Sequence, residues 1–460
     1  MPMLLAVLGC ADNPHTITLE VYSWWDDTAE RTAFEAVAQM HHDTHSNVEV
    51  VNLRNSSVDA RRELSLRLLA EAPPATFQAN VGTDLLRWAL VDTVNDPAKD
   101  VRERYDETKS LITDLTDLYN RELAGRLTEP VDSMLRLAEG SAPYAVPINV
   151  HRLNYLYYNK KRVDEKYGDP DDLLSIDTLC PESPGQAPLE INISVALDDE
   201  WTLILFVFEN LLPALIEREI QKDPDFDDEF YTHLFRGLEP ADGGRLPGGE
   251  SVLVKKALEC AQYLSQRFTN FPRWTEAVRD VGRPETTTTF TVMGDWANAL
   301  LEQELSEGSV VAKPFPGTGG VYVYTSDTFP LPIGAEYPSE ALELLRTFAN
   351  GDAQREFSRL KGSIPARSDI HFDSPLGWNT TEEFESPSVK KLLATSGYFP
   401  VYYPLDQLGG DLGRMLSEGA GEARVNDALR RFTDAEKVLG RWQRRLLEGA
   451  ARTTTTTPMP

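Results

Sequence analysis

The chain has 460 residues, of which 41% are hydrophobic, and its formal net charge is -28. This length is enough for two or three ordinary cores, and the composition is that of a folded globular protein. The charge argues against nucleic-acid binding, because no basic block offsets the 73 acidic residues and phosphates would be repelled.

The amino terminus predicts a membrane anchor. Residues 3–10 form a short apolar run that ends at Cys10, as at a bacterial lipoprotein cleavage site where that cysteine receives the lipid. The run has only about eight apolar residues and no preceding Lys or Arg, so an upstream start or a frayed terminus are the alternatives. Elsewhere we expect no spanning helix, and so any attachment would be through lipid.

In the first part of the chain, the hydrophobic pattern alternates between strand and helix periods, as in a doubly wound α/β unit. Pro73 and Pro74 end the second helix of this unit. The predicted strands are 17–22, 48–53 and 75–78, and the predicted helices are 29–42 and 58–69.

The rest of the chain predicts a second α/β unit. Residues 144–159 form a long aromatic-rich extended segment, which we expect to cross between the units. Further strands are predicted at 190–197, 290–293, 310–315 and 321–331, and helices at 201–217, 252–267, 339–349, 353–360 and 422–447. The Thr-rich tail at 451–460 is expected to be disordered.

Two cysteines remain after Cys10, namely Cys180 and Cys260. In an exported protein this even pair predicts a disulfide, whereas in a cytosolic chain both would be buried thiols. Neither cysteine has a metal-ligand spacing, so we expect no zinc. His41, His42 and His45 offer an i, i+4 imidazole pair, but a solvated helix end is the favoured interpretation and we expect no metal.

The first predicted strand ends in Trp24, Trp25, Asp26 and Asp27. An indole face packs against the CH face of a pyranose, while carboxylates accept from its hydroxyls. The carboxyl end of a strand is also where open α/β sheets bind ligands. This pattern predicts a sugar site, with one core tryptophan and one surface tryptophan as the alternative.

Several segments in order resemble family 1 extracellular solute-binding proteins of ABC importers, and more closely their glucose- and mannose-binding branch. They are VYSWW at 21–25, PPATFQ at 73–78, YAVPINVHR at 144–152, FTVMGDW at 290–296 and LKGSIPAR at 360–367. The resemblance implies a two-lobed α/β fold of the type II, maltose-binding-protein-like kind, in which a hinge closes the lobes on a ligand.

On this resemblance, residues 1–15 are the lipoprotein signal and the mature amino terminus. Lobe 1 is expected at 16–157 plus 325–370 and lobe 2 at 158–324 plus 371–450, with hinges near 155–159 and 321–326.

The resemblance also implies the ligand-binding residues. Trp24 and Trp25 would wall the sugar, and Gln78 and Asp295 would bind its hydroxyls. The remaining positions are His151 near the crossing strand and Lys361 from the loop before Ser363. Asp295 as a helix N-cap and Lys361 as a last-turn cation are the alternatives.

The sugar itself is left open by departures from the family pattern. The chain has Asn80 where close relatives have a histidine, and Tyr398, Tyr402 and Tyr403 near another such position. We include Asn80 and Tyr402 among the ligand-binding candidates, together with Trp201, while Trp274 is a further possible platform. Both a monosaccharide and an oligosaccharide fit this set.

The ordered family segments and the lipoprotein-like start favour a binding protein over an enzyme, and the sequence has no GxSxG elbow, P-loop or dinucleotide fingerprint. We therefore expect no cofactor, ABC permease subunits as partners, a monomer, and a lipid-anchored location in the periplasm or at the cell surface. The alternatives are a glycosidase with paired carboxylates and a sugar-sensing subunit of a signalling receptor.

Overall fold

The computed structural model describes residues 16–26, 28–54, 63–68, 70–89, 110–136, 142–167, 175–181, 190–222, 249–372, 381–394 and 412–416. Several predicted features lie outside the described residues. They are the signal segment with Cys10, the tyrosines at 398, 402 and 403 (Tyr402 among the site candidates), the helix at 422–447 and the tail at 451–460.

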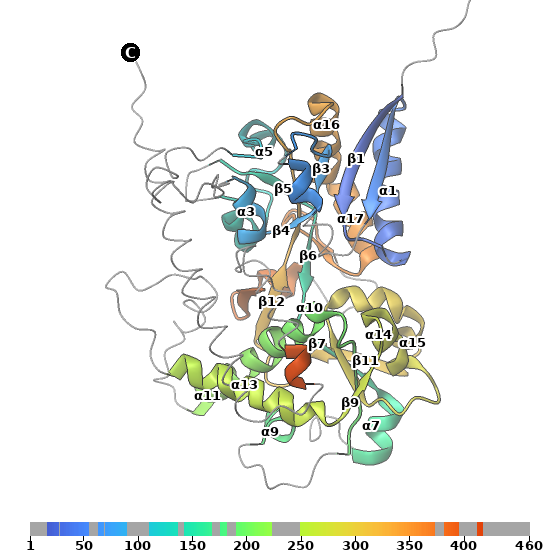
Figure 1. The fold of residues 1–460 in the computed structure, drawn as a ribbon, viewed down its shortest axis with the longest axis vertical. Helices are drawn as coiled ribbons and strands as arrows, with labels where there is room; N and C mark the ends of the chain where they lie inside the picture. The colour runs from blue at the N-terminus through green and yellow to red at the C-terminus, as the bar shows by residue number, and fades with distance from the viewer. Residues whose placement is uncertain are drawn as a thin grey trace, which may run out of the picture.

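The first lobe is the upper body in Figure 1 and contains two small sheets. One has the parallel order β2-β1-β3, and the other has the antiparallel order β4-β13-β5. Leu19 and Val21 of the first strand face the core at alternate positions, as a half-buried strand requires. The strands are β1 (Ile17–Ser23), β2 (Val48–Arg54), β3 (Thr76–Phe77), β4 (Ala79–Asn80), β5 (Ala145–Pro147) and β13 (Asp327–Pro330).

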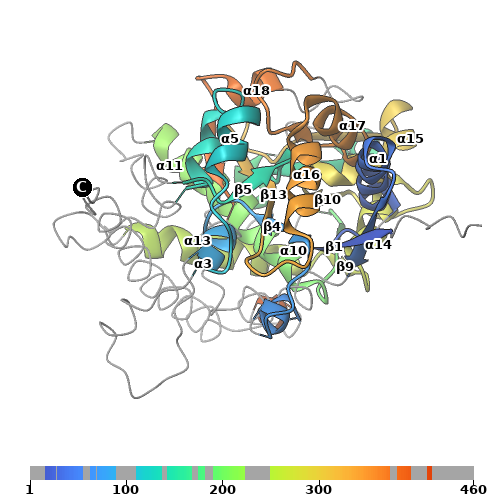
Figure 2. The ribbon, with the colours of Figure 1, turned by 90° about the horizontal axis from the view of Figure 1, so that it is seen from above.

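Helices cover these sheets. Seen from above, α16 packs on β5 and contacts α5, while α1 lies against α17 (Figure 2). The helices of this lobe are α1 (Thr28–Thr44), α3 (Thr83–Ala89), α5 (Thr116–Glu122), α6 (Glu129–Met134), α16 (Pro338–Ala349) and α17 (Gly351–Lys361). Residues 63–68 are also helical, within the predicted helix at 58–69.

The second lobe is the lower body in Figure 1, and its sheet has the order β11-β7-β10-β8-β9. These strands are β7 (Tyr155–Asn159), β8 (Ile193–Val195), β9 (Phe268–Asn270), β10 (Phe290–Met293) and β11 (Val310–Pro314). The helices are α7 (Lys160–Tyr167), α9 (Ile176–Leu179), α10 (Glu200–Ile204), the π-helix η1 (Leu205–Leu211), α11 (Leu212–Lys222), α13 (Gly249–Ser265), α14 (Trp274–Gly282), the 3₁₀ helix η2 (Asp295–Leu300) and α15 (Glu302–Ser306).

The sequence predicts one regular helix at 201–217. In the structure this helix widens at its centre into the buried π-helix η1, with α10 before it and α11 after it. Pro213 lies two residues after the end of η1 and has no backbone N–H to donate. Within the π-helix, the side chain of Asn210 donates to the carbonyl of Leu205 over 2.9 Å, which satisfies an acceptor in the widened turn.

Strands β6 (Asn149–Arg152) and β12 (Val321–Thr325) run between the two lobes in Figure 1. They pair antiparallel in a sheet of order β14-β6-β12-β15, together with β14 (Ile364–Pro365) and β15 (Lys390–Leu393). The guanidinium of Arg152 lies over the rings of Tyr155 and Tyr322 and pairs at 2.6 Å with Glu383 of α18 (Thr381–Glu385). This buried cation fixes the crossing strands to each other.

Extended segments that the sequence predicts as continuous are divided in the structure. Segment 144–159 is divided at Ile148 and again at 153–154, and segment 321–331 is divided at Ser326. The shorter segment 75–78 contains only β3 and stops at Gln78, the break before β4. At each break the chain leaves one sheet and enters another, which hydrophobic periodicity does not report. The predicted boundary at 157/158 falls inside β7, and the exact lobe limits stay predictions.

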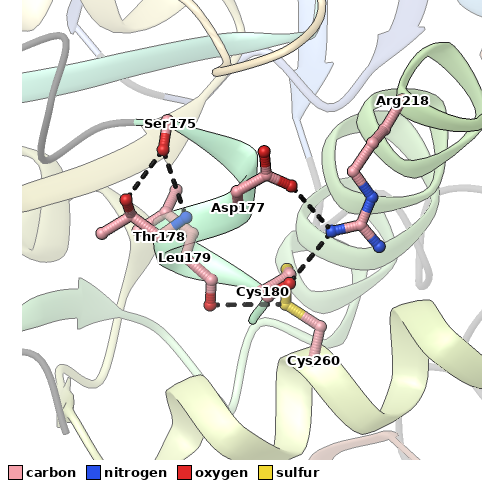
Figure 3. The surroundings of a disulfide bond; sticks show 7 residues. All are labelled: Ser175, Asp177, Thr178, Leu179, Cys180, Arg218 and Cys260. Carbon is pink, nitrogen blue, oxygen red and sulfur yellow. Dashed lines mark hydrogen bonds and ion pairs between the residues drawn. A yellow bond between two sulfur atoms is a disulfide. The ribbon is translucent and has the colours of Figure 1, made fainter. Parts of the chain in front are cut away.

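Cys180 and Cys260, the predicted pair, are joined by a disulfide with Cα atoms 5.3 Å apart (Figure 3). Cys180 caps α9 and Cys260 lies on α13, so the bond ties these two helices together. Arg218 of α11 donates to the Cys180 carbonyl over 3.0 Å and pairs with Asp177. In the part of the chain that the structure describes, no helix has both the length and the apolar character needed to cross a bilayer.

We expect replacement of both cysteines by alanine to lower the free energy of unfolding by about 4 kcal/mol, because the bond closes a long loop in the unfolded chain. Urea unfolding of the Cys180→Ala/Cys260→Ala variant measures this, with the reduced parent as the matched comparison. Thiol labelling at either cysteine in the denatured but unreduced parent would contradict the bond.

Candidate functional site

A buried carboxylate, Asp327, occupies the first position of β13, immediately after the break at Ser326. Gln78 Nε2 donates to Asp327 Oδ1 over 2.7 Å, and Asn149 Nδ2 donates to Asp327 Oδ2 over 2.9 Å. The backbone N–H of Asp327 donates in turn to Asn149 Oδ1 over 2.9 Å. Residues at the sheet-to-sheet breaks therefore converge on one carboxylate.

His151 joins this carboxylate to a second one from the other lobe. Its Nδ1 pairs with Asp295 Oδ1, and its Nε2 lies 3.3 Å from Asp327 Oδ2. The second oxygen of Asp295 accepts from the backbone N–H of Arg152 over 2.8 Å. The imidazole is 2% exposed and Asp295 is 0% exposed, so these contacts are shielded from water. Burial by itself would lower the pKa of His151, but the charge of Asp295 and the hydrogen bonds to Asp295 and Asp327 together outweigh it, and the pKa is raised.

Lys361 supplies a second cation at the end of α17. Its Nζ pairs at 2.7 Å with Glu30 of α1, lies 3.9 Å from Asp327 Oδ2 and sits 5.0 Å from the ring centroid of Trp25. Burial would raise the pKa of Asp327, but Lys361 and His151 hold it well below its usual range. The adjacent Gly362 has a φ of 88° and ends α17 in the left-handed conformation, where a Cβ would meet the Asp295 carbonyl at 3.0 Å.

The two neighbouring tryptophans at the end of β1 have different environments. Trp25 is 0% exposed and packs among Phe34, Phe329 and Phe357 in the core. Trp24 is partly exposed, and its backbone N–H donates to Gln78 Oε1 over 3.2 Å. A sugar contact from Trp24 fits its exposure, while the burial of Trp25 does not support one.

On the second lobe, partly exposed indoles form a continuous cluster. Trp296 lies edge-on to His151, with ring centroids 5.2 Å apart and an interplanar angle of 88°. Trp201 is 5.9 Å from Trp296 and 6.1 Å from Trp274, centroid to centroid. A Cβ on Gly294 would lie 2.2 Å from the Trp296 ring, so this ring position requires the glycine.

An ion pair completes the connection between the lobes. Asp26, two residues after Trp24, lies 3.8 Å from Arg273, which directly precedes Trp274 on the second lobe. Asp26 also lies 3.8 Å from Arg54 of β2. Contacts and positions close together in the chain thus connect Trp24 with Asp26 by way of the buried carboxylate of Asp327 and the indoles of the second lobe. We call this set the interlobe circuit, and its members are Trp24, Gln78, Asp327, His151, Trp296, Trp201, Trp274, Arg273 and Asp26.

The structure brings together most of the predicted site residues. Gln78, His151, Asp295 and Lys361 meet in the buried network, Trp24 and Trp201 lie in the circuit, and Asn80 pairs in register with Asp327 across β4 and β13. Gly294, not Asp295, is the N-cap of η2. Direct ligand contacts of these side chains stay predictions.

The sequence did not single out several other members of the site. Asn149 and Trp296 lie inside the quoted family segments, so a closer examination of those segments could have found them. Asp327 and Glu30 carry no local signal, because their roles come from strands and helices that are distant in sequence.

Other features of the described residues carry no comparable chemistry. No group of three or more His, Cys, Asp or Glu side chains is arranged to hold a metal in the described ranges. His41 stacks on His45 and bonds to Thr347, and burial lowers the pKa of His41 to about 4. A hollow of about 410 Å³ between α1 and β2 shares Arg54 with the Asp26 ion pairs but contains no indole or buried carboxylate of the circuit.

The two-lobed α/β fold is that of the maltose-binding-protein-like solute receptors, as predicted. A bacterial solute receptor described as having an exclusive preference for β-D-galactopyranose superposes with a TM-score of 0.65 and 14% identity, covering 92% of this chain and 100% of that one. At this identity, the likeness shows the fold.

The relatives in sequence agree with this fold, although no family model matches the chain. An uncharacterised ABC transporter extracellular-binding protein of Pyrococcus horikoshii is 28% identical over 437 residues, which cover 91% of this chain and 87% of that protein. A xylose/arabinose-binding protein of Haloferax volcanii is 24% identical over 365 residues, covering 76% and 70%.

The chain is a relative of the extracellular solute-binding proteins of ABC transporters, which confirms the predicted resemblance. These relatives are binding proteins rather than enzymes. The glucose- and mannose-binding branch is not confirmed.

The different burial of the paired tryptophans gives a test of their roles. We expect Trp25→Ala to lower the free energy of unfolding by about 3–5 kcal/mol, because it leaves a large cavity in the core. Trp24→Ala, at a partly exposed position, should cost distinctly less. Urea unfolding of both variants decides this, with Trp25→Phe as a milder core control, and equal stability of the two alanine variants would contradict it.

Proposed function

We propose that the protein captures a saccharide between its two lobes, outside the cytoplasm, and delivers it to an ABC permease. The observation that carries this proposal is the interlobe circuit, which joins indoles and hydrogen-bonding side chains from both lobes. A ligand held there would contact both lobes at once, which is the requirement for a ligand to favour a closed state.

The chemistry of the circuit suits a sugar. Trp24, Trp201, Trp274 and Trp296 are partly exposed, so they can offer apolar surface to the CH faces of pyranose or furanose rings. Exposed Asp26 and Arg273 can exchange their long ion pair for bonds to hydroxyl groups. The pentose-binding name of one relative and the galactopyranose preference of one structural neighbour support this ligand class.

The charge state of the site supports binding without hydrolysis. A glycosidase needs one protonated carboxylic acid beside a second carboxylate. In the buried network the opposite holds, because His151 and Lys361 lower the pKa of Asp327 and keep it ionised. Both oxygens of Asp295 are engaged by His151 and by the Arg152 amide.

An extracytoplasmic location is supported by the relatives and by the disulfide, which persists in oxidising compartments. We further propose a lipid anchor at Cys10 and a monomeric state, as the sequence suggests.

Sugar binding should change the fluorescence of the circuit indoles. We expect titration with pentoses, hexoses and short oligosaccharides to quench tryptophan emission. Trp24→Ala and Trp296→Ala should each weaken the affinity for the best ligand by roughly 1–3 kcal/mol, because each removes a stacking surface. Trp88→Phe is the matched control, since Trp88 is buried, packs on Phe77 and is not a member of the circuit. Unchanged affinity in both alanine variants would place the site elsewhere.

Saturating ligand should also make the protein more compact, because the ligand adds differential affinity for the closed state. Small-angle scattering with and without sugar measures this change in the parent. Trp296→Ala should show the same compaction once its weaker binding is saturated. A parent that binds sugar without any compaction would contradict capture between closing lobes.

A further inference from the structure

One imidazole, that of His151, connects carboxylates that belong to opposite lobes. His151 lies on the crossing strand β6, where it pairs in register with Thr325 of β12. Asp295 begins η2, two residues after the last residue of β10 in the second-lobe sheet, whereas Asp327 begins β13 of the first lobe. Each ring nitrogen faces one of these carboxylates.

The number of protons on the ring decides how many carboxylates it can hold. A carboxylate only accepts, so both contacts require that both ring nitrogens carry a proton. A neutral ring can donate from Nδ1 to Asp295, but its Nε2 is then an acceptor that faces another acceptor on Asp327. The charged ring thus links both lobes, and the neutral ring links His151 to only one of the two carboxylates.

When the ring is neutral, Asn149 can replace Asp327 as the hydrogen-bond partner of Nε2. Its Nδ2 lies 2.9 Å from His151 Nε2 and can donate to it when that nitrogen is unprotonated. The orientation of the amide is fixed by Asp327, whose N–H donates to Asn149 Oδ1 while its Oδ2 accepts from Asn149 Nδ2. The neutral ring thus has Asn149 as the donor to Nε2, whereas the charged ring has its Nε2 proton beside the Asn149 amide, which is also a donor, and can direct that proton only to Asp327.

The surrounding groups set the balance between these states. Asp295 of η2 and Asp327 of β13 favour the charged ring, whereas burial and the Lys361 ammonium on α17 oppose it. Glu30 of α1 pairs with Lys361, Gln78 bonds to Asp327, and the Arg152 side chain on β6 is directed to Glu383. The indole of Trp296 packs edge-on against the imidazole. The net effect raises the pKa above its usual value of 6.5.

We propose that His151 is a positioning residue that carries a proton in the ligand-bound, closed protein and couples lobe opening to loss of that proton. This inference rests on the proposed function. An open state separates the lobes, so the imidazole there has fewer carboxylate neighbours and binds its proton less tightly than in the closed state.

The sign of the pH dependence follows from this difference. The closed state holds the His151 proton more tightly than the open state does. The extra stability that this proton gives the closed state is therefore fully present below the open-state pKa of His151, and it is lost as pH rises through the closed-state pKa. Sugar affinity should therefore fall with rising pH, by at most about tenfold per pH unit for a single coupled proton. Binding within that window should take up a proton from the buffer.

Isothermal titration of the full chain with its best sugar, in buffers of different ionisation enthalpy and over a range of pH, tests the proposal. The parent should take up protons on binding and lose affinity as pH rises. His151→Gln keeps a polar side chain but cannot be protonated, so its affinity should not vary with pH in that window. His371→Gln is the control, since His371 is exposed and lies 3.7 Å from Glu382 on the surface, and it should retain the parent profile.

A second variant guards against a folding defect in His151→Gln. Asp295→Asn removes one of the two carboxylates that favour the charged ring. In this variant the fall in sugar affinity should therefore occur at lower pH than in the parent. A parent that binds sugar at constant affinity, with no proton uptake, overturns the proposal even if neither variant folds, and leaves the proposed function intact. Failure of the parent to bind any saccharide refutes the proposed function, and this inference with it.

Discussion

The structure depends on a set of buried charges of opposite sign that pair with one another where the two lobes meet. Asp327, Asp295 and Glu30 are matched there by His151 and Lys361, all of them largely removed from water. Burying one such charge alone would cost several kcal/mol, and breaking a buried pair by removing one partner typically costs about 3–5 kcal/mol. The elements that carry these residues must therefore come together in one arrangement, which places the rest of the site.

The breaks between sheets explain why these residues meet. The chain leaves one sheet for another at Gln78, Ile148 and Ser326, and at each break polar groups of the backbone or side chain need new partners. The N–H of Ile148 donates to the Asp327 carbonyl over 3.0 Å, and the N–H of Val81 donates to the Ser326 carbonyl over 2.9 Å. These bonds satisfy groups that neither sheet can satisfy, and the pairing of His151 with Asp295 and Asp327 joins the lobes.

The buried network and the exposed indoles have separate tasks in this arrangement. The network holds the crossing strands and fixes Trp296 through His151, while Gly294 leaves room for its ring. On the first lobe, Trp24 is held by the bond from its backbone N–H to Gln78. The residues best placed to meet a ligand are therefore positioned by others that are almost wholly buried.

The sequence by itself determined the α/β class, most strands and helices, and the family, because these follow from local periodicity and from short segments such as those around Trp24, His151 and Asp295. It also identified Cys180 and Cys260 as a pair by count. Tertiary structure alone decided which tryptophan of the adjacent pair is core, since β1 directs the Trp25 ring toward Phe34, Phe329 and Phe357. It likewise decided that Asp327 and Glu30 belong to the site. Both act on partners more than a hundred residues away, as in the bond from Gln78 to Asp327 and the ion pair from Lys361 to Glu30, and no local pattern encodes contacts over such a separation.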